Sequence, residues 1–184
     1  MAWCRVCVLA MLAMTQSTAY AESVPTPIAI VVSASWPTPD EIGLVTLRRV
    51  YLGRITTWAG QRVERFELAP GSAARTAFGR VVVEKSEREM EQYWLEQALT
   101  GGAIPPREVE GIGEMTLAIS SRSGAIGYLP LVALTGDVRR KLRVLALSTE
   151  RGIYFPGEPG YPILVESSGE AAPERAPRES EAQR

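Results

Sequence analysis

The chain has 184 residues, with 20 basic and 21 acidic side chains, a formal net charge of −1 and no histidine. Such a balanced charge gives no electrostatic reason to expect binding to nucleic acid or to an anionic membrane. The lack of histidine excludes Ser-His-Asp and Cys-His catalysis and the usual nitrogen ligands of zinc. No nucleophile–base pair is evident, so we expect no enzyme, no cofactor and no metal site.

The first 21 residues follow the pattern of a cleaved export signal. Arg5 precedes a short apolar segment, residues 6–14, and Ala19-Tyr20-Ala21 supplies the small residues that a signal peptidase recognises. Because the apolar segment is too short to span a bilayer comfortably, we expect cleavage after residue 21 and a periplasmic mature protein without a stable membrane anchor. The alternative is an uncleaved N-terminal anchor.

Both cysteines, Cys4 and Cys7, lie within this export signal. Their C-x-x-C spacing is typical of a redox or metal pair, but cleavage would remove them. The mature chain is therefore expected to have no thiol, no disulfide and no Cys-based metal site.

After the signal, the sequence predicts strands that alternate with helices. A β-branched apolar segment at 28–33 is typical of a strand buried on both faces. Apolar residues at helical spacing predict a helix over about 43–52, which ends at Gly53. A strand is expected over 63–68, and the segment after it leads into a helix that ends near residue 83.

The second half of the chain continues this alternation. Ser86-Glu87-Arg88-Glu89 is an S-x-x-E capping box, which predicts a helix from there to the Gly101-Gly102 stop. Pro105-Pro106 forces an extended connection. The remaining expected elements are a short helix over 114–122 and strands over 124–129 and 142–147, with Gly124 and Gly127 at close-packed points.

This order of elements predicts a single α/β domain over residues 28–166. The last segment, 167–184, contains no large apolar residue and is dominated by Pro, Glu, Ala and Arg. We expect it to be a disordered tail.

The stretch APGSAARTAF, residues 69–78, has the pattern of a loop that leads into a helix. Ser72 is a favourable N-cap, and the first backbone N–H groups of such a helix can bind an anion. Two interpretations stay open, a plain helix cap and an anion site. Arg75 is either a solvated residue of the first turn or a ligand, and its position is unfavourable for the helix dipole.

Three segments, taken in order, resemble one known family. They are LRRVYLGRITTW at 47–58, GSxxRxxF at 71–78 and SGAIGY at 123–128, where serine replaces the usual opening proline. Tyr93-Trp94, Gly101 and Pro105-Pro106 also lie where the family pattern places them. The set resembles the periplasmic substrate-binding proteins of phosphate ABC transporters, which have the type-2 periplasmic binding protein fold.

The resemblance implies two lobes that hold phosphate between them. This chain is too short for two lobes, and it lacks the glycine-rich ligand loop that precedes the first of these segments in the family. We therefore expect a short homologue with a single lobe, built as a central mixed sheet flanked by helices.

The resemblance also implies a set of ligand-binding residues. Family members carry an arginine, three residues and then Ser-Gly-Thr, whereas this chain has Leu68, Ser72, Ala73 and Ala74 at the corresponding positions. Arg75 matches an arginine often found next, so the candidate ligand-binding residues are Ser72, Ala73, Ala74 and Arg75. Losing one charged and one neutral hydrogen bond weakens binding by about 2–4.5 kcal/mol, or two to three orders of magnitude.

We therefore expect an exported, solute-binding-like protein in which binding of phosphate or another oxyanion is weak or lost. The alternative is an interaction or structural protein that kept the fold without a ligand. In that case a transporter permease, another partner or a second copy of the chain would cover the former cleft.

Two groups of side chains are expected to have no ligand role. Trp58, Tyr93 and Trp94 should pack in the core or on the surface of the lobe. The acidic pairs Glu87/Glu89 and Glu108/Glu110 should be solvated charges on helices or loops.

Overall fold

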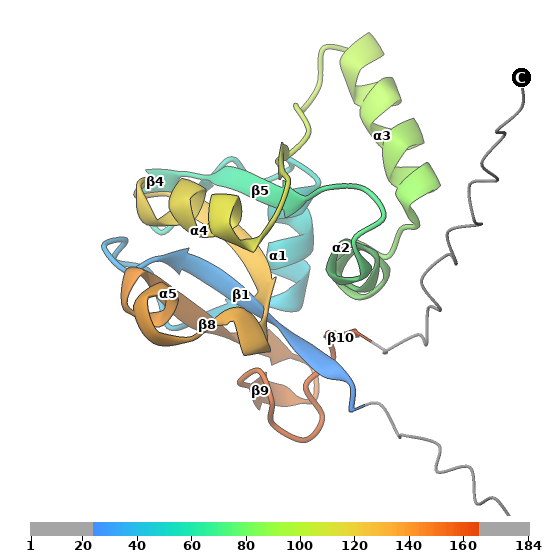
Figure 1. The fold of residues 1–184 in the computed structure, drawn as a ribbon. Coiled ribbons are helices and arrows are strands. Elements are labelled where there is room, and N and C mark those ends of the chain that lie inside the picture. Colours follow the sequence, from blue (N-terminus) through green and yellow to red (C-terminus); the bar gives the residue numbers. More distant parts are fainter. Residues whose placement is uncertain (1–23, 166–184) are drawn as a thin grey trace, which may run out of the picture.

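A computed structural model of the chain describes residues 24–165, so the predicted export signal and tail lie outside the described residues. The described chain forms one mixed sheet with helices on both faces (Figure 1). The strands in their order across the sheet are β2 (Glu41–Gly43), β8 (Leu142–Thr149), β1 (Thr26–Ser33), β7 (Ala125–Pro130), β5 (Glu64–Leu68) and β6 (Arg107–Val109). This architecture confirms the predicted α/β fold with a central mixed sheet.

Strand β1 is the centre of the sheet. It runs antiparallel to both of its neighbours, with Ile30 opposite Tyr128 of β7 and Leu145 of β8. Strand β5 pairs in parallel with β7 and β6, and β2 pairs in parallel with β8. Residues 28–32 are fully buried, as the uninterrupted apolar segment predicts for a strand covered on both faces.

Short strands extend this sheet and form a separate hairpin. Two of them add to the edges of the long strands: β9 (Gly152–Tyr154) pairs with β8, and β10 (Leu164–Val165) pairs with β1. The other two, β3 (Thr57–Trp58) and β4 (Gln61–Arg62), pair with each other.

The helices are divided between the two faces of the sheet. Figure 1 shows α4 (Ile112–Ser120) and α5 (Gly136–Lys141) on one face and α1 (Leu44–Tyr51) on the other. Helix α2 (Ala73–Phe78) continues directly into a π-helical turn, η1 (Gly79–Val83), which packs against α1. A short 3-10 helix, η2 (Leu131–Ala133), follows β7.

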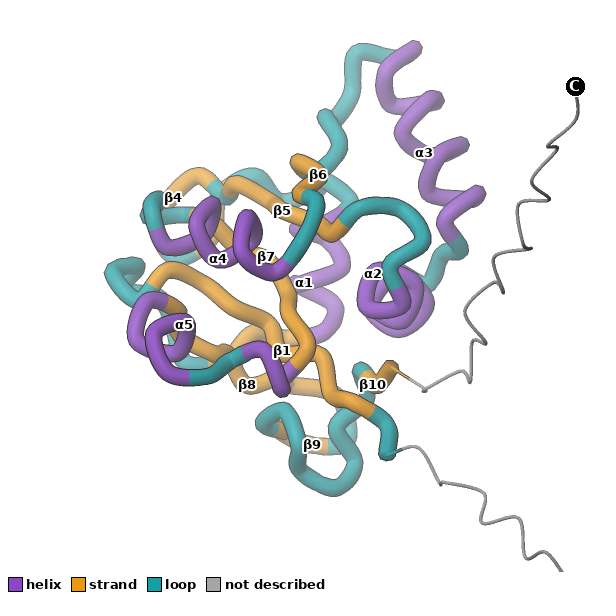
Figure 2. The backbone as a smooth tube through the Cα atoms, viewed as in Figure 1, coloured by secondary structure: helices purple, strands orange, loops and turns teal. Residues whose placement is uncertain are grey.

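Helix α3 (Glu87–Leu99) stands away from the body of the molecule (Figure 2). None of its residues is fully buried, although Met90 and Tyr93 pack partly against the core. The predicted capping box begins this helix. The Glu89 N–H donates to the Ser86 hydroxyl at 3.3 Å, and the Ser86 N–H donates to the Glu89 carboxylate at 2.8 Å.

The two glycines expected at close-packed points confirm that expectation. Gly124 has φ +92°, and a Cβ there would lie 2.4 Å from the carbonyl oxygen of Arg62. A Cβ on Gly127 would lie 2.6 Å from the side chain of Ile119 on α4. The two glycines therefore let the chain at β7 approach the end of β4 and helix α4 closely.

The aromatic residues that were expected to pack do so. The rings of Trp58 and Trp36 meet edge to face at a centroid distance of 5.4 Å, and those of Tyr93 and Trp94 at 4.8 Å. The Tyr93 hydroxyl donates to the carbonyl of Leu52 at 2.8 Å, which ties α3 to the end of α1.

Candidate functional site

The predicted ligand-binding segment forms the start of α2. Ser72 occupies the N-cap position with extended backbone angles (φ −67°, ψ 127°), and its carbonyl accepts a hydrogen bond from the Thr76 N–H at 3.0 Å. Its hydroxyl makes no capping hydrogen bond. The predicted cap therefore exists as backbone geometry only.

The structure does not bring the four candidate ligand residues to one site. Ser72, Ala73 and Ala74 line a cavity of about 430 Å³, which we call the Ser72 cavity. Arg75 lines a different cavity of about 720 Å³, which we call the Glu67 cavity. The reason is helical geometry, because successive residues are rotated by about 100° around the helix axis.

The Ser72 cavity is mostly apolar. Its walls include Leu68, Pro130 and Val132, and Val132 is 72 % exposed. The charged side chain in its lining is acidic, namely that of Glu110. An anion at this position would thus meet hydroxyl and backbone groups of the described chain, with no guanidinium in the lining.

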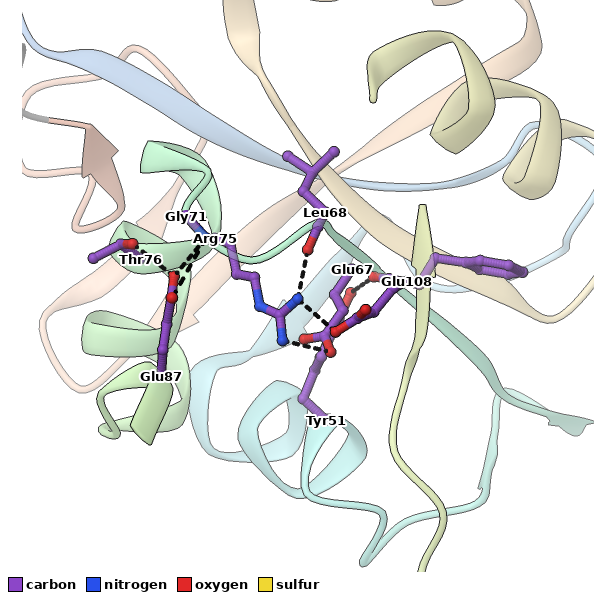
Figure 3. A network of polar contacts seen from close by, with 9 residues as sticks. Tyr51, Glu67, Leu68, Gly71, Arg75, Thr76, Glu87 and Glu108 are labelled. Carbon is purple, nitrogen blue, oxygen red and sulfur yellow. Dashed lines mark hydrogen bonds and ion pairs between the residues drawn. The ribbon is translucent and has the colours of Figure 1, made fainter. Parts of the chain in front are cut away.

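Arg75 does not line the Ser72 cavity, and acceptors surround its guanidinium (Figure 3). Its guanidinium donates to the Leu68 carbonyl at 2.9 Å and to the Glu108 carboxylate at 2.8 Å, and it lies 3.2 Å from the Glu67 carboxylate. Burial opposes the charge, but the hydrogen bond with Glu108 and the charge of Glu67 outweigh it and raise the pKa of Arg75. With a side chain only 15 % exposed, Arg75 is not a solvated residue of the first turn.

Glu67 is the group that the sequence analysis missed. It lies on β5 between the buried residues Phe66 and Leu68, and its own side chain is 10 % exposed. Burial raises its pKa from 4.5 to about 7, although Arg75 acts in the opposite direction. Its position between Phe66 and Leu68, the two apolar residues of the strand, was the signal that could have identified it.

Besides Glu89 in the capping box, two acidic residues interpreted as solvated charges have specific partners. Glu87, at the start of α3, accepts hydrogen bonds from the Thr76 hydroxyl at 3.0 Å and from the Gly71 N–H at 3.3 Å (Figure 3). Glu108 pairs with Arg75 from β6. The interpretation as solvated charges did not include these contacts, which arise because β6 and α3 bring the two residues to the start of α2. Glu108 itself remains 53 % exposed.

The carboxylates around Arg75 make this region unfavourable for an anion. Glu67, Glu87 and Glu108 together oppose one guanidinium, and Glu87 already contacts the Gly71 N–H just before α2. Within residues 24–165, no group of three acidic, histidine or cysteine side chains is placed to hold a metal ion. In the same range, no helix is long and apolar enough to cross a membrane.

Comparisons with known proteins agree with the fold and its size. No protein-family model and no curated protein sequence matches this chain. Similar solved structures include three proteins. One is a protein from Clostridium perfringens, assigned as a phosphate ABC transporter substrate-binding protein and solved with bound phosphate (19% identity, TM-score 0.52). The others are a possible phosphate binding protein from Planctomyces limnophilus DSM 3776 (10% identity, TM-score 0.56) and PstS from Borrelia burgdorferi (15% identity, TM-score 0.55). The matches cover 67%, 73% and 77% of this chain.

The chain spans about half the length of these structures, namely 45%, 46% and 55%. At these identities the likeness concerns the fold. It confirms, at that level, the resemblance to phosphate-binding proteins that the sequence motifs indicated, and a short chain that corresponds to part of them.

Proposed function

We propose that this chain is an exported, non-enzymatic protein of the solute-binding type in which oxyanion binding at Ser72, Ala73, Ala74 and Arg75 is weak or lost. The proposal includes a periplasmic location, which rests on the export-signal pattern and on the likeness to substrate-binding proteins of ABC transporters. A permease of such a transporter is the corresponding partner.

The observation that carries the proposal is the pairing of Arg75. An oxyanion that bound Arg75 would have to displace the Glu108 carboxylate at 2.8 Å and approach the negative charge of Glu67. The other three candidate residues offer one hydroxyl and backbone N–H groups, beside an acidic side chain. Neutral hydrogen bonds of this kind contribute about 0.5–1.5 kcal/mol each, too little for tight capture.

Calorimetry with phosphate and sulfate tests this proposal. We expect millimolar affinity or none for the mature chain, and a micromolar dissociation constant would overturn the proposal. Any binding at the Ser72 cavity should persist in Arg75→Ala, because Arg75 lines the other cavity. Loss of that binding in the variant would show that Arg75 contributes to the oxyanion site.

Releasing Arg75 from its carboxylates is the sharper test. The double variant Glu67→Gln/Glu108→Gln keeps the shape of both side chains and removes their charge, so we expect phosphate affinity to rise by about tenfold or more. Glu41→Gln, an exposed change on β2, is the matched control and should leave affinity unchanged. Equal phosphate affinity in the double variant and the parent chain would show that ion pairing is not what weakens binding.

A second candidate function is an interaction role without a ligand, and the Ser72 cavity favours it. This cavity combines apolar walls with the exposed residues Ile112 and Val132. A second copy of the chain is the simplest partner, and light scattering of the mature protein measures it. We expect Val132→Glu to shift a dimer to monomer, whereas a strictly monomeric parent chain would rule out self-association.

A further inference from the structure

The Glu67 cavity has the size and construction of a site for a small organic molecule. Its volume of about 720 Å³ lies within the range of roughly 300–1,000 Å³ that is typical of such sites. Apolar and aromatic side chains from five elements form its walls. They are Tyr51 from α1, Phe78 from α2, Val83 from η1, Met90 from α3 and, beside them, Tyr128 from β7.

Three aromatic rings meet at this cavity. Phe78 and Tyr128 stack at a centroid distance of 4.0 Å, and Tyr51 contacts Phe78 edge to face at 4.6 Å. The Tyr51 hydroxyl donates to the backbone carbonyl of Phe66 at 3.0 Å, which holds this ring in place. The three residues are at most 2 % exposed and form a preformed aromatic cluster at the cavity. Aromatic rings attract cations as well as apolar groups.

Two buried residues with polar groups line the cavity. The Glu67 carboxylate lies 3.2 Å from the guanidinium of Arg75. Tyr128 is fully buried, and its hydroxyl makes no hydrogen bond among the described residues. The backbone of Leu68 is close enough to influence the pKa of Tyr128, yet no hydrogen bond of normal geometry joins them. Buried hydroxyls without a partner are rare in proteins.

The charges around Glu67 favour a cationic ligand group. Glu67 faces Arg75 and Arg65 as positive groups, Glu108 and Glu87 as negative groups, and the phenols of Tyr51 and Tyr128. Arg75 is shared with Glu108, and Arg65 donates to the backbone carbonyls of residues 50, 51 and 104. The carboxylates are thus only partly neutralised, while an anionic ligand would find the donors of Arg75 already occupied. The other charged residues of the lining are of both signs. They are Arg80, Lys85 and Arg88, and Glu84, Glu87 and Glu89.

We propose that the Glu67 cavity binds a small organic ammonium ion, which donates hydrogen bonds to the Glu67 carboxylate and the Tyr128 hydroxyl and packs its apolar part against Tyr51, Phe78 and Met90. This site is distinct from the Ser72 cavity. Its function does not depend on whether the chain also binds an oxyanion.

Three probes of equal size test the chemical class. The mature chain is titrated by calorimetry at about pH 8 with 2-phenylethylamine, 2-phenylethanol and phenylacetate, which carry a cation, a hydroxyl and an anion on the same ring. We expect the amine to bind at least about tenfold more tightly than either of the others. Equal affinities, a preference for phenylacetate, or no amine binding at millimolar concentration would overturn the proposal.

Two variants test the polar groups. We expect Glu67→Gln to weaken amine binding by about 10- to 100-fold and Tyr128→Phe by about 3- to 10-fold, with little effect on 2-phenylethanol for the first variant. Glu41→Gln is the matched control. Unchanged amine affinity in Glu67→Gln would contradict the proposal. Met90→Trp, which fills the mouth from the half-buried start of α3, should reduce binding of the amine and of 2-phenylethanol together, and it keeps the test valid if Glu67→Gln fails to fold.

Proton linkage gives an independent readout. Because 2-phenylethylamine stays protonated between about pH 6 and about pH 8 and binds the ionised carboxylate, its affinity should rise over that interval. At about pH 7, binding should release a fraction of a proton, which calorimetry in two buffers of different ionisation enthalpy measures. Glu67→Gln should abolish this release, and a release that persisted in that variant would assign it to another group and refute the role of Glu67.

Discussion

The two cavities beside helix α2 differ in their lining, although residues of the same first helical turn contribute to both. On one side, the Ser72 cavity offers a hydroxyl, backbone groups and apolar walls beside Glu110. On the other side, the Glu67 cavity holds Arg75 among carboxylates and aromatic rings. Residues that are adjacent in the chain thus serve two different environments.

This difference shows how an anion site can be weakened without changing the fold. A helix N-terminus keeps its backbone donors whatever the side chains are. The strength of anion binding comes largely from a cationic side chain near the helix. Here the guanidinium of Arg75 is already paired with Glu67 and Glu108. Arg75 lines the Glu67 cavity and not the Ser72 cavity, so the two cavities differ in the charge that they offer to a ligand.

Removing the charge of Arg75 should have the largest effect on stability. Arg75→Met keeps an apolar stem but leaves Glu67 buried without its ion-pair partner, so we expect the free energy of unfolding to fall by about 3–5 kcal/mol at about pH 8. The loss should be smaller at about pH 5, where Glu67 is protonated. Urea unfolding measures both values. Arg49→Met, at an exposed position of α1, is the control, and equal losses in the two variants would contradict the role of the ion pair.

Glu67 should make stability depend on pH. Its pKa is raised from 4.5 to about 7, so between these values the folded protein retains a proton that the unfolded chain has released. The free energy of unfolding therefore falls as the pH rises through this interval, by at most about 3 kcal/mol. Glu67→Gln should flatten that part of the curve in urea unfolding at several pH values, whereas Glu41→Gln should not. An unchanged slope in Glu67→Gln would show that other groups cause it.

The two N-cap serines should differ by a smaller amount. Ser86→Ala removes a capping box with both hydrogen bonds present, and we expect a loss of about 1 kcal/mol. Ser72→Ala removes a hydroxyl that makes no capping hydrogen bond, so the loss should be at most a few tenths of a kcal/mol. Thermal unfolding compares them. A larger loss for Ser72→Ala would mean that its hydroxyl has a stabilising partner in solution.

Much of the fold could be predicted because its main elements carry local signals. The apolar segment at 28–33, the helical spacing at 44–51 and the capping box at 86–89 are each present with ends within two residues of those expected. The expectations did not include β2, β6, β9 or α5, each of six residues or fewer. Elements this short depend on pairing with distant segments, for example β2 with β8, and that pairing leaves little trace in the local sequence.

The candidate site could be predicted only in part, because some of its residues carry local signals and others are brought together by the fold. The sequence identified Ser72 as an N-cap and singled out Arg75, but it gave no indication that Glu67 and Glu108 lie beside that arginine. These residues come from β5 and β6, and their meeting depends on the parallel pairing that places Glu67 opposite Glu108. Glu87 joins them from α3, 16 residues after the Gly71 N–H that it accepts from.

The sequence by itself determined the order of the longer strands and helices, the start of α2 at Ser72 and the absence of histidine chemistry. These features follow from periodicity, capping preferences and composition, which are local properties of the chain. Only the tertiary structure decided which cavity Arg75 faces, that its charge is neutralised by two carboxylates, and that a buried acid and an unpaired phenol share one cavity. Those facts depend on how β5, β6, β7 and α2 come together, because burial and ion pairing are properties of neighbours in space.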